Sequence, residues 1–274
     1  MPIFTKKKIR LLYIISIFFL VIMSIVWLIG NLLFTQDQWF EARLFQDIII
    51  VGSIALATVF LFYLSILYKP STSVGKVWLL LALGALGWTI GELIFSYYEL
   101  FTDVEPFPSI ADFFYLIAYI PLSMALILQM VHMDITLAKK EKIVIAIVYA
   151  LICVFVIVTV IVIPIQQASP IPESEVFAYF VGALYPILDL ILILCVFVVF
   201  AKIRHGKVNT AWILLLIGIL ITTIADILFN WVETLNVPEQ LFYPYDLLFI
   251  ISYVFILNSA WTMIYLMKQA FQKT

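Results

Sequence analysis

The sequence predicts an all-α integral membrane protein with eight transmembrane helices. Of its 274 residues, 65% are hydrophobic and 12% are charged, which leaves too few polar side chains to cover a soluble domain of this size. A helix needs about 20 apolar residues to cross a hydrocarbon core about 30 Å thick. Eight runs meet this length, near residues 10–34, 45–67, 77–101, 110–132, 143–165, 178–201, 210–233 and 244–267. β-Barrel strands would instead be shorter segments of alternating polarity, so we expect helices.

The first run could be mistaken for a signal peptide, because a cluster of basic residues precedes it. However, the run is longer than a typical signal-peptide core and no small-x-small cleavage site follows it. We therefore expect an uncleaved first span. The loops between the runs are short, so the chain is predicted to be a single membrane domain, 1–274, without an output domain of its own.

Basic residues alternate between the loops in a way that orients the chain. Of the 15 Lys and Arg residues, all but Arg43 fall on one side of the predicted spans. By the positive-inside rule, this side is cytoplasmic, and both termini lie on it in a cell membrane. No basic stripe remains to suggest nucleic-acid binding, because topology accounts for the lysines. No Lys or Arg lies within the predicted spans.

An internal duplication carries acidic residues within the predicted spans. Shifted by 134 positions, residues 78–122 align with 212–256 without a gap, and 13 of the 45 positions are identical. Glu92 then aligns with Asp226, Glu99 with Glu233, and Asp112 with Asp246. We predict repeat one at about 10–132 and repeat two at about 143–267. Four spans per repeat make the repeats parallel, related by a pseudo-two-fold axis along the membrane normal.

Three of the acids are predicted to lie deepest in the membrane: Glu92, Asp226 and Asp189. Glu92, Ser96 and Glu99 share one helical face, and Asp226, Asn230 and Glu233 repeat this face in the second copy. An acid facing lipid would cost about 2.5–3.5 kcal/mol, so we expect both faces to turn inward and line an outward-opening pocket. These seven residues are the candidate ligand- or cation-binding residues.

Structural roles are the alternative interpretation of the polar residues. Duplicated acids can simply join helices by hydrogen bonds. Asp112 and Asp246 begin their spans, so they are candidates for helix capping or for the pocket rim. Two groups of aromatic residues are typical of membrane-interface anchors. They are Tyr97, Tyr98, Trp231, Tyr243 and Tyr245 on the outer side and Trp78 and Trp212 on the inner side.

The sequence does not indicate a cofactor, and the metal content of the pocket stays open. His132 and His205 are the only histidines and both lie near the cytoplasmic side, which argues against a histidine-rich zinc site. Cys153 and Cys195 lie within spans and are expected to act as small apolar residues. The buried acids could be protonated, share a proton, accept hydrogen bonds or bind a cation.

One stretch of the first repeat resembles a family of sensory modules. It contains Gly91-Glu92, Tyr97-Tyr98-Glu99, residues 106–112 (Pro-Phe-Pro-Ser-Ile-Ala-Asp), Tyr115 and Tyr119. This pattern resembles the multipass membrane input modules of prokaryotic diguanylate cyclases and histidine kinases, over roughly 35 residues. The resemblance implies a module that receives an extracytoplasmic or membrane-borne signal and acts through a cytoplasmic or membrane signalling partner.

Two other functions remain as alternatives. The chain also resembles the eight-span lysoplasmalogenase family in span count and in its embedded acids, which would make Glu92 and Asp226 part of a lipid hydrolase. Internal repeats with acids inside the membrane also occur in small cation- or proton-coupled transporters. The favoured prediction is a sensory or ligand-binding module rather than an enzyme. It would take a small-molecule, lipid or cation ligand in an acidic pocket.

Overall fold

The structure is a computed structural model that describes residues 25, 28, 29, 33, 36–133, 136–167, 171–203, 209–234 and 244–271. Among these residues it forms seven helices that are long and apolar enough to cross a membrane. The chain is therefore a helical protein of the multipass membrane type. The first predicted span, 10–34, lies almost entirely outside the described residues.

Each of the other seven predicted spans coincides with a helix. The helices are α2 (Trp39–Tyr68), α3 (Ser73–Phe101), α4 (Ile110–His132), α5 (Lys139–Val156), α7 (Val176–Lys202), α8 (Asn209–Thr234) and α9 (Pro244–Phe271). A π-helical turn (Ile157–Val162) and the short α6 (Ile163–Gln167) continue α5. The short 3-10 turns Gln36–Gln38 and Glu173–Glu175 precede α2 and α7. The largest difference from prediction is at α2, which begins six residues before position 45.

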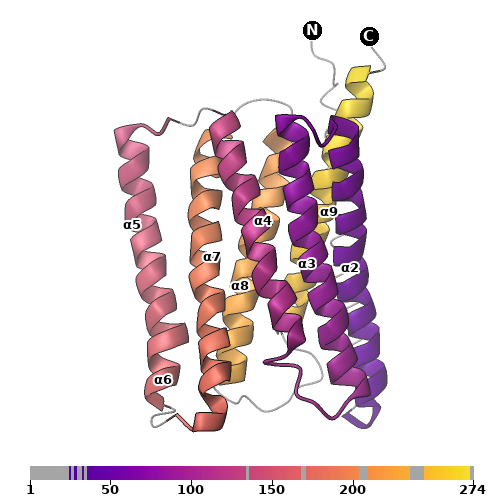
Figure 1. Ribbon diagram of the computed structural model, residues 1–274, viewed down its shortest axis with the longest axis vertical. Coiled ribbons are helices and arrows are strands. Elements are labelled where there is room, and N and C mark those ends of the chain that lie inside the picture. Colours follow the sequence, from indigo (N-terminus) through magenta and orange to yellow (C-terminus); the bar gives the residue numbers. More distant parts are fainter. Residues whose placement is uncertain are drawn as a thin grey trace.

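Six of these helices form a closed ring, and the seventh lies outside it (Figure 1). In ring order they are α2, α3, α4, α7, α8 and α9, and α9 contacts α2 to close the ring. α5 packs against the outer side of α7, where Lys202 Nζ lies 2.9 Å from Glu141 Oε2. Side chains on the inner side of the ring are therefore shielded from lipid by neighbouring helices.

Close contacts at glycines bring α3 against α4 and α8 against α9. A Cβ atom added at Gly84 would lie 2.4 Å from Leu122 Cγ, and one added at Gly218 would lie 2.8 Å from Ile256 Cγ1. Small residues at such positions allow membrane helices to approach closely. Gly218 lies 134 positions after Gly84, and Ile256 lies 134 positions after Leu122. The two helix pairs thus pack through corresponding residues.

Hydroxyl groups join neighbouring helices inside the ring. Thr58 Oγ1 and Thr89 Oγ1 are 2.9 Å apart across α2 and α3, and Thr222 hydrogen bonds to Ser252 across α8 and α9. Thr223 Oγ1 instead donates to the backbone oxygen of Leu220 at 2.9 Å. The Thr58–Thr89 and Thr222–Ser252 contacts each join two helices, which is a common use of polar residues in membrane bundles.

The two tryptophans predicted to be inner-interface anchors lie inside the bundle. Trp78 is fully buried and Trp212 is 5% exposed, and their ring centroids are 5.1 Å apart. The anchor prediction is wrong because each indole finds its apolar surroundings on the other indole rather than at the lipid boundary. The contact joins α3 to α8 across the ring.

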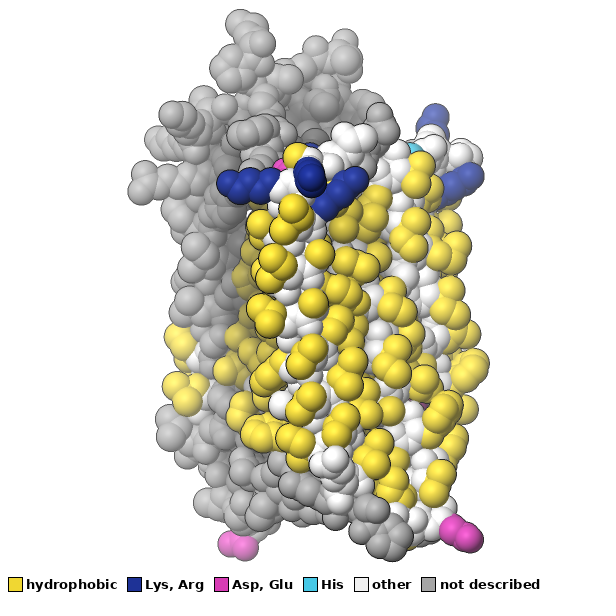
Figure 2. Space-filling model, turned by 90° about the vertical axis from the view of Figure 1, so that its left-hand side faces the viewer, with side chains coloured by type: hydrophobic (Ala, Val, Ile, Leu, Met, Phe, Trp, Pro, Cys, Tyr) yellow, Lys and Arg dark blue, Asp and Glu magenta, His cyan; other side chains and the backbone are white. Residues whose placement is uncertain are grey.

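Charged residues separate to the two ends of the bundle (Figure 2). Lysines gather at the end that holds the α2–α3, α4–α5 and α7–α8 connections, called the basic end below. Exposed acids such as Asp103 and Glu105, between α3 and α4, lie at the opposite, acidic end. The lateral face between the ends is mainly apolar, as a membrane-facing surface requires.

Candidate functional site

A pocket lies inside the helix ring, in the half of the bundle nearer the acidic end. It encloses about 790 Å³ of space free of atoms, including the part open at its mouth, and twenty residues line it. Half of these residues are aromatic. Six carry carboxyl groups, and one carries a guanidinium group: Asp47, Glu92, Glu99, Asp112, Asp226, Asp246 and Arg43. The pocket is thus both acidic and rich in aromatic rings.

Duplicated positions supply most of its walls. Twelve lining residues form six pairs whose members are 134 positions apart in the sequence: Trp88/Thr222, Glu92/Asp226, Phe95/Phe229, Asp112/Asp246, Tyr115/Phe249 and Tyr119/Tyr253. Spacings of three, four and seven residues place each set on one face of its helix. The corresponding faces of α3 and α8, and of α4 and α9, therefore turn toward a common space.

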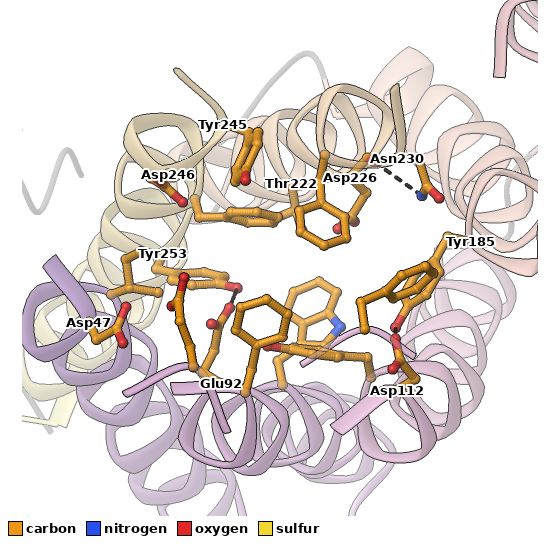
Figure 3. A pocket seen from close by; sticks show the side chains of 18 of the residues that line it. Asp47, Glu92, Asp112, Tyr185, Thr222, Asp226, Asn230, Tyr245, Asp246 and Tyr253 are labelled. Atoms are coloured by element: carbon orange, nitrogen blue, oxygen red, sulfur yellow. Dashed lines mark hydrogen bonds between the residues drawn. The ribbon is translucent and has the colours of Figure 1, made fainter. Parts of the chain in front are cut away.

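Glu92 and Asp226 enter the pocket from opposite walls, formed by α3 and α8 (Figure 3). Tyr253 on α9 donates a hydrogen bond to Glu92 Oε1 at 2.7 Å, and Tyr119 on α4 donates one to Asp226 Oδ2 at 3.3 Å. The two hydrogen bonds are equivalent under the 134-residue shift. Each tyrosine binds the acid of the other sequence copy, so the bonds link the two copies across the pocket.

Asp189, the third of the deep acids, lies behind this arrangement. Its side chain is 1% exposed, and Oδ1 accepts a hydrogen bond from Tyr119 at 2.8 Å. The single hydroxyl proton of Tyr119 is therefore shared between Asp189 and the more distant Asp226. Asp189 supports the pocket wall and is not among the lining residues.

Arg43 organises the end of the pocket formed by α2. Its guanidinium group forms an ion pair with Glu99 on α3, and Nη1 lies 3.4 Å from Asp246 Oδ2 on α9. The Arg43 residue is only 5% exposed. We predicted that no basic residue lies within a span, and this prediction is wrong. Helix α2 begins early enough to carry Arg43 inward, where two carboxyl groups compensate its charge.

Asp47 lies one turn after Arg43 on the same face of α2. The residue is 7% exposed and lines the pocket, and the Ser96 hydroxyl lies beside its carboxyl group. Its Oδ2 atom has no hydrogen-bond partner. A buried carboxyl oxygen without a partner is costly, which marks this position as one that a ligand could satisfy.

The opposite end of the pocket contains Asp112, Tyr185 and Asn230 (Figure 3). Asp112 Oδ2 accepts a 2.6 Å hydrogen bond from the backbone N–H of Ser109. This bond is part of the capping box at the start of α4. Asp112 Oδ1 accepts another, also 2.6 Å long, from the Tyr185 hydroxyl. Asp112 thus caps its helix and lines the pocket as well.

The remaining candidates and anchors are placed differently. Ser96 shares the α3 face but is not a lining residue, whereas Asn230 is. Glu233 lies in the last turn of α8, and its side chain is outside what the structure describes. Among the predicted outer anchors, Tyr97 and Trp231 are exposed. The prediction is wrong for Tyr245, which is 5% exposed and lines the pocket. Tyr243 lies outside the described residues.

Cys153 and Cys195 are free thiols.

Several lining residues were not among the sequence candidates. Asp47 and Arg43 share a face with Ile50, at spacings of three and four residues, which is a signal that the sequence contains. Tyr115 and Tyr119 likewise follow Asp112 at three and seven residues. Tyr185 lies outside the aligned segments 78–122 and 212–256, so neither the duplication nor acid content pointed to it. Its role depends on how α7 packs against α4.

Among the described residues, no group of His, Cys, Asp or Glu side chains is arranged to hold a metal ion. Comparisons with known protein families, with curated proteins and with solved structures find no match to this chain.

Proposed function

We propose that this chain is a membrane-embedded ligand-binding module of the sensory type, whose pocket receives a small molecule from the outer side of the membrane. The observation that carries this proposal is the pocket itself. It lies inside the helix ring, and ten of its twenty lining residues are aromatic. Aromatic walls with a few converging charged groups are the usual composition of small-molecule sites.

A topology with an outward-facing pocket belongs to the same proposal. The chain would cross the membrane eight times as two parallel four-helix repeats, with the basic end and both termini in the cytoplasm. Three observations support it: the clustering of lysines at one end, the six pairs of lining residues 134 positions apart, and the crossed tyrosine–acid hydrogen bonds. The pocket then lies in the outer half of the membrane.

The resemblance to input modules of cyclases and kinases supports a sensory role. A ligand that bridges both repeats would change how α3, α4, α8 and α9 pack, because the lining residues of all four helices surround it. The basic ends of these helices would carry that change to a signalling partner on the cytoplasmic side.

A photo-crosslinking experiment tests whether the pocket holds a small molecule. Benzoylphenylalanine replaces Phe95, which lines the pocket, or Leu93, which is on the same helix but 53% exposed on its outer face. Both variants are irradiated in cells, purified and weighed intact by mass spectrometry. We expect a discrete adduct at Phe95 that is absent at Leu93, where membrane lipids alone should react. Identical adducts at both positions, or none at Phe95, would contradict the proposal.

Activity assays separate this role from its rivals. Protein in liposomes is tested for lysolipid hydrolysis and for proton- or cation-driven flux, alongside Glu92→Gln and Asp226→Asn. A ligand-binding module should show neither activity. Turnover or flux that both variants abolish would replace the sensory role with a hydrolase or a transporter.

A further inference from the structure

The charges of the pocket walls do not balance. Arg43 pairs with Glu99 and Asp246, which are two of the six acidic lining residues. Within the described ranges, no salt bridge joins a basic side chain to the other four acids: Asp47, Glu92, Asp112 and Asp226. Acidic groups in a shielded space are stabilised when positive charge is brought to them. A positively charged occupant would therefore stabilise the ionised forms of these acids.

Neutral donors hold the two central acids in place. The hydroxyl groups of Tyr253 and Tyr119 donate to Glu92 and Asp226. As hydrogen-bond acceptors, both carboxyl groups present negative potential to the space between the α3 and α8 walls. The two acids face the pocket from opposite walls, so a cationic group in the space between them would be attracted by both.

Asp47 gives an independent indication of a ligand. Only 7% of this residue is exposed, yet it lines the pocket, and its Oδ2 atom has no hydrogen-bond partner. The protein satisfies Glu92, Asp112 and Asp226 through tyrosine hydroxyls but leaves this oxygen without a hydrogen bond. A donor on a bound molecule would supply the missing partner.

Aromatic rings next to the acids distinguish an organic cation from an inorganic one. The ring centroid of Trp88 lies 6.5 Å from that of Tyr119 and 6.4 Å from that of Tyr253, the two tyrosines that bind the acids. Ring faces attract alkylated or primary ammonium groups, especially where water is excluded. Inorganic cations such as Ca²⁺ or Mg²⁺ prefer a close shell of oxygen atoms, whereas half of this lining is aromatic.

We propose that the ligand of this pocket is an organic cation whose ammonium group lies between Glu92 and Asp226, beside the rings of Trp88, Tyr119 and Tyr253. A donor of the same molecule reaches Asp47 at the α2 end. This inference rests on the proposed ligand-binding function and names the chemical class of the ligand.

Matched probes on the unmodified protein give the first test. Protein in nanodiscs is titrated with phenethylamine, tetraethylammonium and spermidine, and with two uncharged or anionic controls, phenethyl alcohol and phenylpropionate. Binding is followed by tryptophan fluorescence and by the thermal unfolding midpoint, Tm. We expect at least one cation to raise Tm by about 5 °C at a concentration near 100 times its Kd, with no rise from the controls.

Variants then locate the binding site. Glu92→Gln and Asp226→Asn should each weaken binding of that cation by about tenfold or more. The matched control is Glu105→Gln, which neutralises an exposed acid between α3 and α4 outside the lining set and should leave Kd unchanged. Asp47→Asn should weaken the binding of probes with a second amino group, such as spermidine, more than it weakens the binding of tetraethylammonium.

The outcomes separate this inference from the proposed function. If phenethyl alcohol binds as tightly as phenethylamine, or if none of the three cations binds, the ligand is not an organic cation. The Phe95 crosslinking adduct decides separately whether the pocket holds a small molecule. The comparison of amine with alcohol uses unmodified protein, so it remains decisive even if a variant fails to fold.

Discussion

At the scale of single residues, Arg43 is the most consequential side chain of the described bundle. One guanidinium group joins α2 to α3 through Glu99 and to α9 through Asp246. All three side chains are shielded from bulk solvent, with exposures of 6%, 15% and 6%. Burying such a charged group costs free energy. Removing one of its members costs more, because the remaining charges are left buried without compensation.

Replacing Arg43 by methionine should therefore destabilise the protein strongly. We expect Arg43→Met to lower the free energy of unfolding by about 3–5 kcal/mol, because Glu99 and Asp246 lose their shared cation. Thermal unfolding in nanodiscs measures the change. The triple variant Arg43→Met, Glu99→Gln, Asp246→Asn removes every charge of the group and should recover most of the loss. An Arg43→Met protein as stable as the wild type would show that the ion pairs contribute nothing.

How far the sequence predicts the site differs from residue to residue. Glu92 and Asp226 could be found because acids are costly inside a membrane and these two recur at one spacing. Tyr119 and Tyr253 are themselves a duplicated pair, but their hydrogen bonds to these acids could not be predicted, because each tyrosine binds the acid of the other sequence copy. Pairing between helices far apart in the chain is set by packing, which a single sequence does not express.

At the scale of helices, the two glycine-mediated contacts hold α3 to α4 and α8 to α9. The Cβ atom that alanine would add at Gly84 meets Cγ of Leu122, a branch point that cannot move without shifting the whole side chain. Gly52 on α2 is a matched control, since a Cβ atom there meets nothing within 4 Å. Both positions lie inside long helices, so alanine gains the same helix propensity at each.

This pair of glycines gives a test of helix packing. We expect Gly84→Ala to reduce the free energy of unfolding by about 1–3 kcal/mol through overpacking against Leu122. Gly52→Ala should be neutral or stabilise the protein by up to about 1 kcal/mol. Thermal or denaturant unfolding of both variants isolates the contact as the difference between them. Equal stability of the two variants would mean that the α3–α4 contact accommodates an added Cβ atom at no cost.

Helix positions were predicted well, and their lateral orientation less so. Apolar length alone placed α4 at residues 110–132, the same bounds as Ile110–His132 in the structure. The start of α2 was missed because Glu41 and Arg43 lower the local hydropathy, although Arg43 is buried by its ion pairs. Trp78 and Trp212 were assigned to the membrane interface for a similar reason, since hydropathy does not distinguish a lipid-facing indole from a buried one.

At the scale of the whole molecule, the pocket and the duplication are one feature. Residues 134 positions apart contact each other at two levels of the bundle, Trp78 with Trp212 and Phe95 with Phe229, at centroid distances of 5.1 and 6.1 Å. Such contacts would lie on the proposed pseudo-two-fold axis, and the six pairs of lining residues surround the same region. The lining residues that fall outside this pairing include Arg43 and Asp47 at one end of the pocket and Tyr185 at the other.

The proposed eight-span topology makes a prediction about the termini. With eight spans, the N-terminus lies on the same side as the basic end, whereas seven spans would put it on the opposite side. Single cysteines are introduced at Thr5, Glu105 and Lys140 in a Cys153→Ala, Cys195→Ala background and treated with a membrane-impermeant maleimide. In intact cells, we expect labelling of Glu105→Cys alone, because Glu105 is exposed at the acidic end between α3 and α4.

Permeabilised cells supply the control for this labelling. Thr5→Cys and Lys140→Cys should both react once the membrane is opened, which shows that their silence in intact cells reflects sidedness and not burial. Labelling of Thr5→Cys together with Glu105→Cys in intact cells would place the N-terminus outside and leave the chain with seven spans. The two repeats would then lack a matching first helix, and the pseudo-two-fold relation would be restricted to the six helices of the ring.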